Sequence, residues 1–534
     1  MRIMPQRPVL HLAIVAIVAT LATLPLARAE TVLRWASVGG ALTFDPHGQR
    51  HTPTEAIQNQ VYEALVRLKN SLVLEPGLAI AWDLIDPVTW QFTLREGVRF
   101  HDGTPLTADD VVFSVGRARA EKSEVADLFK KITGALAVDN RTVQVKTSSP
   151  DLLLPVSLSS LMIMPRGWAE RHDAVEPSRP KDDLQGWTAI HANGTGPFRL
   201  EAFEPAGRIV MVRNPDWWGG EVAIDRIVHD TIPDPDERLA ALLSGELDLL
   251  IDPPFAALDQ IRATPGLKLE QTTEFRAIFL ALDQASTELR SSNLKGRNPF
   301  KDRSVRRAMY QAIDIERIRD EIMNGLALPA GMIIEPGVNG YSPELDRRLP
   351  FDPEGAKRLL ADAGYPDGFS IQLDCPNNRY INDEAICRQV ATQLGAVGIA
   401  VTVNAQPLAD HLTRIWNHET DFYMLGWGGG MPAFDSAQIL RDWFHSVPGN
   451  RYNATGYGNP QLDALIAAID AEMVTYARDA LIEEAWQIAL DDIPLLPLHH
   501  QVIVWAMRDD LQLPIDPRAI PWFKNARFGA PAQE

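Results

Sequence analysis

The sequence predicts an α/β protein, and three observations lead to this class. Segments with the alternation of a strand and segments with the period of a helix follow one another along the chain. Several helices begin at a recognisable cap, and no internal repeat or low-complexity tract is present. The 534 residues are 46% hydrophobic and 23% charged, which is typical of a folded chain with two or three domains.

The elements of the N-terminal third begin with a strand over Thr31–Ser37 and a helix over Thr54–Leu68. Trp90–Leu94 alternates its apolar side chains onto one face and predicts another strand. After a polar turn, Thr107 and Asp110 have the spacing of a capping box, which predicts the start of a helix there.

The middle of the chain continues the alternation. A strand opening at Gly194–Gly196 is expected to pair with Arg208–Arg213, and a helix over Pro235–Leu243 leads into a strand over 244–250. Gly194-Thr195-Gly196 is interpreted as a turn, because a strand follows it and phosphate binding needs a helix N-terminus.

The second half has the clearest helix signals. Asp352-Pro353 and Asn459-Pro460 each place a capping residue before a proline at the first helical position. Ala480–Leu490 is predicted to be a further helix. Residues 493–500 contain two prolines, so we interpret them as a crossover between domains and not as a central strand.

The net charge and the N-terminal segment indicate which partners are disfavoured and where the protein is located. The formal net charge of −19 disfavours nucleic-acid binding. Residues 1–29 have a basic start, a short apolar run and the small-x-small cleavage site Ala27-Arg28-Ala29, which together are typical of a cleaved signal peptide. A single membrane anchor is the alternative. We therefore expect a soluble exported protein, in the periplasm.

The chain has two cysteines, Cys375 and Cys387. In an oxidising compartment such a pair is expected to form a disulfide, here between a strand over Phe369–Asp374 and the next helix. Free buried thiols are the alternative. Two cysteines are too few for a structural zinc site.

No catalytic motif supports a secreted hydrolase. The chain has no G-x-S-x-G elbow, no S-x-x-K and no P-loop, and His499-His500 are adjacent, which places them on opposite faces of an extended segment. We therefore expect a protein that is not an enzyme and needs no cofactor or metal.

Residues 426–432 read Gly-Trp-Gly-Gly-Gly-Met-Pro. Glycines let a backbone approach another group closely, and Trp427 can offer a flat apolar face, so Trp427 and Gly428 to Gly430 are candidate ligand contacts. A glycine-rich surface loop beside a core tryptophan is the alternative.

The segment 92–114, FTLREGVRFHDGTPLTADDVVFS, resembles the signature of the extracellular solute-binding proteins of ABC importers, family 5, the dipeptide-, oligopeptide-, nickel- and opine-binding type. Further stretches resemble the same family in the expected order, among them GTGPFRL, RNPDWWGG, LLSGELDLL, FKDRSVRRAMYQAID, FDPEGAKRLLADAGYPDGF, YGNPQLDALI and DDIPLLPLH. The resemblance covers about residues 31–505.

This resemblance implies a two-lobed periplasmic binding protein of the large peptide-binding class, type II, with a hinge and an inserted subdomain. Residues 30–50, 190–273 and 498–534 would form one lobe, 51–189 its inserted subdomain and 274–497 the second lobe. The crossovers would lie near 274–280 and 494–500.

The resemblance also implies site residues. Residues 426–435 are similar to the family's GWxxDxxDP ligand loop, but Gly430 and Ala433 stand at its acidic positions, and Asp435 is the nearest carboxylate. We therefore hypothesise that a peptide N-terminus is not anchored in the usual way, with Asp435 as the candidate that could still do so.

Basic residues at two places are further candidates. Arg379-Tyr380 lies where dipeptide-binding members carry an arginine for the ligand carboxylate, and Arg50-His51-Thr52 lies in the loop that lines the cleft. The resulting expectation is a monomeric subunit that closes around a small polar solute with an anionic end, such as a peptide or an opine-like compound, and delivers it to an ABC permease. A secreted hydrolase, and a sensor or chaperone on the same fold, are the alternatives.

Overall fold

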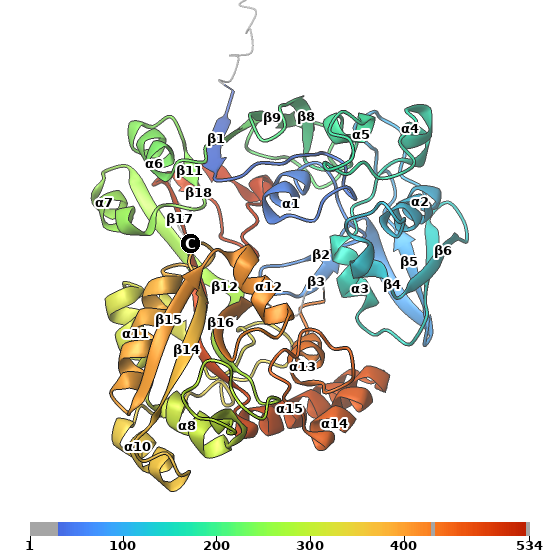
Figure 1. Ribbon diagram of the computed structural model, residues 1–534. Coiled ribbons are helices and arrows are strands. Elements are labelled where there is room, and N and C mark those ends of the chain that lie inside the picture. The colour runs from blue at the N-terminus through green and yellow to red at the C-terminus, as the bar shows by residue number, and fades with distance from the viewer. Residues whose placement is uncertain (1–29, 429–432, 530–534) are drawn as a thin grey trace, which may run out of the picture.

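A large mixed sheet organises the computed structural model, which describes residues 30–428 and 433–529. Its strands follow the order β15-β14-β16-β12-β17-β11-β1-β10-β9-β8, with β13 added on β17. Figure 1 shows an upper and a lower part joined by the long strands β12 (Leu267–Leu282) and β17 (Leu495–Arg508). These two antiparallel strands pair over most of their length.

The upper half of the sheet has short strands from both ends of the chain. They are β1 (Val32–Ser37), β8 (Phe198–Phe203), β9 (Ile209–Arg213), β10 (Arg226–Thr231) and β11 (Leu249–Leu250). Alternate residues face two cores: Trp35 and Trp505 belong to one, and Ala36 and Ala506 to the other. Helices α6 (Pro235–Ser244) and α7 (Leu258–Ala263) lie at this half (Figure 1).

The lower half contains β13 (Ala327–Pro329), β14 (Phe369–Pro376), β15 (Ile399–Gln406) and β16 (Phe422–Trp427). Along β12, Ile278 and Leu280 enter one core while Ala277 and Phe279 enter another, so helices cover both faces. The first core is covered by α8 (Arg303–Gln311), α9 (Ile315–Arg317), α10 (Pro353–Asp362) and α11 (Asp383–Gly395). The second is covered by α12 (Leu408–Trp416), α13 (Ser436–Phe444), α14 (Pro460–Ala471) and α15 (Thr475–Asp492).

A separate four-stranded sheet, in the order β4-β5-β7-β6, lies at the side of the upper half. Its strands are β4 (Ala79–Asp86), β5 (Thr89–Leu94), β6 (Ile132–Ala137) and β7 (Thr142–Thr147), and it packs against α2 (Ala108–Ala118). The small elements β2 (Val66–Leu68), β3 (Leu74–Pro76), α3 (Leu154–Ser157), α4 (Arg166–Arg171) and α5 (Trp187–Ile190) complete this region. A two-stranded sheet of β18 (Leu511–Gln512) and β19 (Arg527–Phe528) lies near the end of the described chain.

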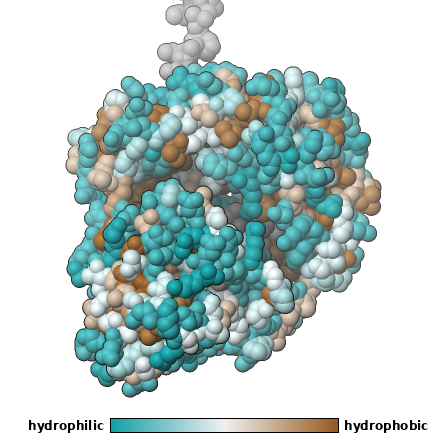
Figure 2. All heavy atoms as spheres, viewed as in Figure 1, coloured by the Kyte–Doolittle hydropathy of each residue, from teal (hydrophilic) through white to brown (hydrophobic). Residues whose placement is uncertain are grey.

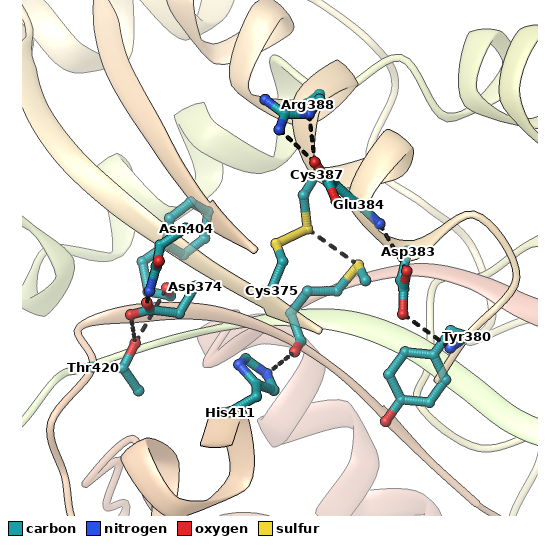
Figure 3. The surroundings of a disulfide bond; sticks show 12 residues. Asp374, Cys375, Tyr380, Asp383, Glu384, Cys387, Arg388, Asn404, His411 and Thr420 are labelled. Atoms are coloured by element: carbon teal, nitrogen blue, oxygen red, sulfur yellow. Dashed lines mark hydrogen bonds and ion pairs between the residues drawn. A yellow bond between two sulfur atoms is a disulfide. The ribbon is translucent and has the colours of Figure 1, made fainter. Parts of the chain in front are cut away.

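Most local expectations are confirmed. The strand at 90–94 is β5, and Thr107 and Asp110 form the capping box of α2. The side chains of Asp352 and Asn459 accept hydrogen bonds at the starts of α10 and α14. The expected disulfide is present between Cys375 of β14 and Cys387 of α11 (Figure 3).

Three expectations are wrong. The strand expected over 244–250 is limited to β11 (Leu249–Leu250), because α6 continues to Ser244 and ends at a left-handed Gly245. The helix predicted over 54–68 is only α1 (Thr52–Gln58), because the carbonyl oxygens of Gln60 and Val61 accept hydrogen bonds from Phe198 and Gly196 and not from the next helical turn. The expectation that residues 493–500 form no central strand is wrong as well, because the central strand β17 starts at Leu495. A register shift beside Pro497 accommodates the missing backbone donor.

Candidate ligand-binding cleft

A cavity of about 200 Å³ lies where the upper part of the molecule meets residues 274–276 of the crossing strand β12 and Phe434 of the lower part. It is lined by the loop before α1, by the region of β2, by residues 274–276 of β12, by Phe434 and by residues 517–524. The space-filling view is mainly hydrophilic on this face and is hollowed between the upper and lower parts (Figure 2). The cavity therefore draws its walls from segments that are far apart in sequence.

The wall formed by β12 is an irregular stretch of a crossing strand. Pairing with β17 shifts register between Thr273 and Ala277, so Glu274, Phe275 and Arg276 leave the ladder and line the cavity. The Arg276 and Glu274 side chains form an ion pair at 3.1 Å, and Gln501 of β17 donates a hydrogen bond to Glu274. We refer to residues 274–276 as the hinge bulge.

Arg379 and Tyr380 adjoin this bulge at the end of β14. The Arg276 guanidinium lies 5.8 Å from the centre of the Tyr380 ring, and that of Arg379 lies 5.5 Å from it. Burial, together with the positive charge of Arg276, lowers the pKa of Arg379. The Tyr380 hydroxyl donates to the carbonyl oxygen of Gly426 at 3.1 Å, which fixes the ring against β16.

The loop before α1 and the first residue of that helix contribute two of the three candidates in this region. Arg50 and Thr52 line the cavity, whereas His51 is exposed at the N-terminus of α1 and does not. Glu55, one turn into the helix, also lines the cavity, and burial raises its pKa although Arg50 opposes the shift. The loop and the first turn of α1 therefore present both a guanidinium and a carboxyl group.

A second polar group forms another wall of the cavity around Glu63. Its buried carboxylate accepts hydrogen bonds from the indole nitrogens of Trp217 and Trp218 at 3.3 and 2.6 Å and from Thr195 at 2.9 Å. Burial raises the pKa of Glu63. Burial also lowers the pKa of Lys524 to about 8, and the positive charge of Arg67 lowers it further.

The glycine-rich loop packs beside the hinge bulge. A side chain at Gly428 would meet the carbonyl oxygen of Phe275 at 2.5 Å, so glycine is required for the close approach of the two segments. Trp427 packs against Trp443 and Tyr452 at 5.4 and 5.3 Å between ring centres. Gly429 and Gly430 lie outside the described residues.

Asp435 lies inside the lower half. Its carboxylate forms two hydrogen bonds of 2.7 Å with Arg478, accepts one from Asn339 at 2.8 Å and caps α13 at the amide of Ala437. Its side chain is 1% exposed. The oxygens of this carboxylate are thus engaged by the protein's own donors, while the neighbouring Phe434 faces the cavity.

Sequence reasoning did not identify the polar residues of the hinge bulge, Glu63, or the segment Arg518–Lys524 as site residues. For the hinge bulge, a signal was present in the sequence: Glu274 and Arg276 are charged residues beside an apolar run, which indicates a polar site at that point. The C-terminal segment carries no local signal, because only the fold brings it next to residues 46–68.

Two features are absent from the described residues. No helix in the described ranges has the length and apolar character needed to cross a bilayer. In the same ranges no cluster of three or more histidine, cysteine, aspartate or glutamate residues is arranged to hold a metal ion.

Two lobes, a pair of crossing strands and a cleft between them define a periplasmic binding protein. HbpA2 from Haemophilus parasuis has the same fold, with a TM-score of 0.81 and 23% identity over 93% of this chain and 100% of that chain. The chain matches the bacterial extracellular solute-binding proteins, family 5, over residues 73–450, and it belongs to this family.

Two curated relatives are each 26% identical to the chain. Heme-binding protein A of Haemophilus influenzae aligns over 84% of this chain and 83% of its own length. The dipeptide-binding protein of Escherichia coli aligns over 93% and 94%. The family expected from the sequence motifs is thereby confirmed, and the chain is a solute-binding protein of the type that serves ABC importers.

Proposed function

We propose that this protein captures a small solute bearing a carboxylate group and delivers it unchanged to an ABC permease in the membrane. The observation that carries the proposal is the excess of basic side chains around the cavity, in a chain whose overall charge is −19. Those lining it are Arg50, Arg67, Arg276, Arg518 and Lys524.

The acidic groups nearby leave part of this positive charge available. Arg276 is paired with Glu274, and Arg518 is paired with Asp516. By contrast, neither Arg50 nor Arg379 forms an ion pair within 4 Å among the described residues, and Arg379 lies against the Tyr380 ring instead. A guanidinium that forms no ion pair within the protein is well suited to bind a ligand carboxylate, although the charge of Arg50 also acts on the nearby Glu55 carboxyl group.

The names of the relatives are compatible with this ligand class. They include a heme-binding, a glutathione-binding and a dipeptide-binding protein, and all three ligands carry carboxylates. The pairing of Asp435 with Arg478 also supports the hypothesis that a peptide ammonium is not anchored here in the usual way. The carboxylate end of the ligand would then provide most of the specificity.

We infer the domain boundaries stated above for the same molecule. A core that contains Leu33, Phe198 and Trp505 supports an upper lobe made from residues 30–50, 190–273 and 498–534. The four-stranded sheet supports an inserted subdomain at 51–189, and the remaining residues 274–497 form the second lobe. Export with removal of residues 1–29, which lie outside the described residues, and a monomeric state complete the proposal.

The test is calorimetry with matched ligands and variants. A dipeptide or glutathione should bind more tightly than the same compound amidated at its carboxyl group, and N-acetylation should matter less. Arg50→Gln and Arg276→Gln should each weaken binding by about 10-fold or more, because a charge-assisted hydrogen bond contributes about 1.5–3 kcal/mol. Arg358→Gln, an exposed arginine on α10, is the matched control.

Mass spectrometry of the bound compound after incubation separates binding from catalysis. Recovery of the unchanged compound is expected, and a hydrolysed product would overturn the proposal. Equal affinity for the acid and the amide in all variants would refute the carboxylate assignment.

A further inference from the structure

A second cavity, of about 140 Å³, lies in the lower half and shares no lining residue with the cleft. Its walls come from α8, from the C-terminal end of α15 and from the loops at 331–333 and 345–349. Apolar side chains form most of the interior: Tyr310, Ile333, Leu345, Phe444, Trp486 and Leu495. A cavity of this size is comparable to an engineered one of about 150 Å³ that takes up benzene.

Three arginines also line this cavity, and their side chains are exposed: Arg303, Arg307 and Arg347. Arg303 and Arg307 are one turn apart on α8 and so share a face of that helix. Arg303 has one loose ion pair, at 3.9 Å, with an Asp491 that is 85% exposed, and Arg307 donates to the neutral Gln311. This clustering of weakly neutralised guanidinium groups contrasts with the acidic chain as a whole.

The walls of the cavity are held in place by buried polar contacts. Arg306, on the buried side of α8, donates hydrogen bonds to the carbonyl oxygens of Asp492 and Ile493 at the end of α15. Asp346 accepts hydrogen bonds from the amides of Gly331 and Met332 at 2.6 and 2.8 Å. These contacts fix the loop that carries Arg347, so the site exists before any ligand arrives.

We propose that this cavity is a second binding site, which takes an organic carboxylate with a compact apolar body. An aromatic ring or a chain of about six carbon atoms would fill the interior, given the size comparison above. The carboxylate would lie among the three guanidinium groups at the rim. This proposal does not depend on the ligand of the cleft.

Benzoate is the probe, and 4-fluorobenzoate observed by fluorine NMR reports its binding to the full folded protein. A ligand of about nine heavy atoms is expected to bind with a dissociation constant on the order of 1 mM. Benzyl alcohol, which has the ring without the charge, should bind about 10-fold more weakly. The combined variant Arg303→Gln, Arg307→Gln, Arg347→Gln should show a similar loss.

A filling variant tests the interior separately from the rim. Ala489→Phe should abolish benzoate binding while the thermal transition stays within a few degrees of the wild type, and Leu345→Phe replaces it if the first variant does not fold. Arg388→Gln on α11 is the control that should bind like the wild type. Absence of binding at about 10 mM, or binding that survives the filling and rim variants, would overturn the assignment; loss of benzoate binding in Arg50→Gln would place it in the cleft.

Discussion

The Asp435–Arg478 ion pair is enclosed by the lower half of the molecule, with side chains that are 1% and 6% exposed. Asn339 and the start of α13 supply the remaining hydrogen bonds of the carboxylate. In such a site each charge depends on its partner, because a single buried charge without compensation is costly. The pair therefore serves to place Phe434 and the start of α13 beside the cleft.

Replacing Asp435 by alanine should lower the free energy of unfolding by about 3–5 kcal/mol, because Arg478 is left buried and unpaired. Denaturant unfolding followed by circular dichroism measures the change. Asp470→Ala, which removes the exposed partner of Arg441, should cost less than about 1 kcal/mol. A small loss in Asp435→Ala, combined with loss of ligand binding, would instead assign this carboxylate to the ligand.

A buried histidine makes stability depend on pH. Burial lowers the pKa of His229 from 6.5 to about 4. Between these values the unfolded chain binds more protons than the folded one, so the free energy of unfolding falls as the pH decreases. His229→Gln keeps an amide donor for the Ser37 hydroxyl, which itself donates to the carbonyl oxygen of Gly39, and should reduce the loss between pH 7.5 and pH 5 by roughly 2 kcal/mol. Exposed His418→Gln is the control, and an unchanged pH profile in His229→Gln would contradict the assignment.

At the level of elements, the disulfide joins β14 to α11 and closes the segment that carries Arg379 and Tyr380. In Figure 3 the side chain of Asp383, at the start of α11, reaches back to the backbone of Tyr380, with a hydrogen bond of 3.1 Å. The covalent link and this hydrogen bond act on the same short connection. Both therefore hold the two candidate residues at the edge of the cleft.

Cys375→Ala combined with Cys387→Ala should lower the free energy of unfolding by about 3 kcal/mol, as the loop-closure entropy of a bond spanning 12 residues implies. Urea unfolding with and without reductant measures it. Reductant should destabilise the wild type and leave the double variant unchanged. Identical stability of the two proteins without reductant would show that the link contributes nothing.

The elements that could be predicted are those whose signal is local. The capped starts of α10 and α14 depend on two or three adjacent residues, and both were found where expected. The end of α1 and the central position of β17 depend on pairing with residues more than a hundred positions away. Proline content alone argued against a strand at 493–500, and tertiary pairing overrode it.

For the whole molecule, the hinge bulge couples the cleft to the two crossing strands. A ligand carboxylate that attracts Arg276 would compete with Glu274, which Gln501 ties to β17. Only contacts that are stronger in one arrangement of the lobes can shift the balance between arrangements. In the proposed function, Arg276 would pair with Glu274 in one arrangement of the lobes and with the ligand carboxylate in the other.

Small-angle scattering with and without saturating ligand tests this coupling. The radius of gyration should decrease with ligand toward the value of about 23 Å expected for a compact chain of this length. Gln501→Leu, which removes the link between the strands, should change the curve of the free protein more than that of the complex. Superimposable curves with and without a proven ligand would exclude lobe closure.

The composition of the site shows the limit of sequence reasoning at this scale. Arg50 and Thr52 line the cavity and Arg379 adjoins it, as motif positions suggested, although their ligand contacts stay predictions. Lys524 and Glu63 share a cavity wall but are separated by most of the chain, and no local pattern relates them.

One core in the upper half contains both Leu33 and Phe523. Because synthesis proceeds from the N-terminus, this core is complete only after Trp505 and Phe523 have been made, although Leu33 shares it with earlier residues such as Phe198. The first strand of the chain thus gains its full set of hydrophobic neighbours only when the last residues of this core have been added, so removal of the segment around Phe523 should loosen the packing of the N-terminal strand.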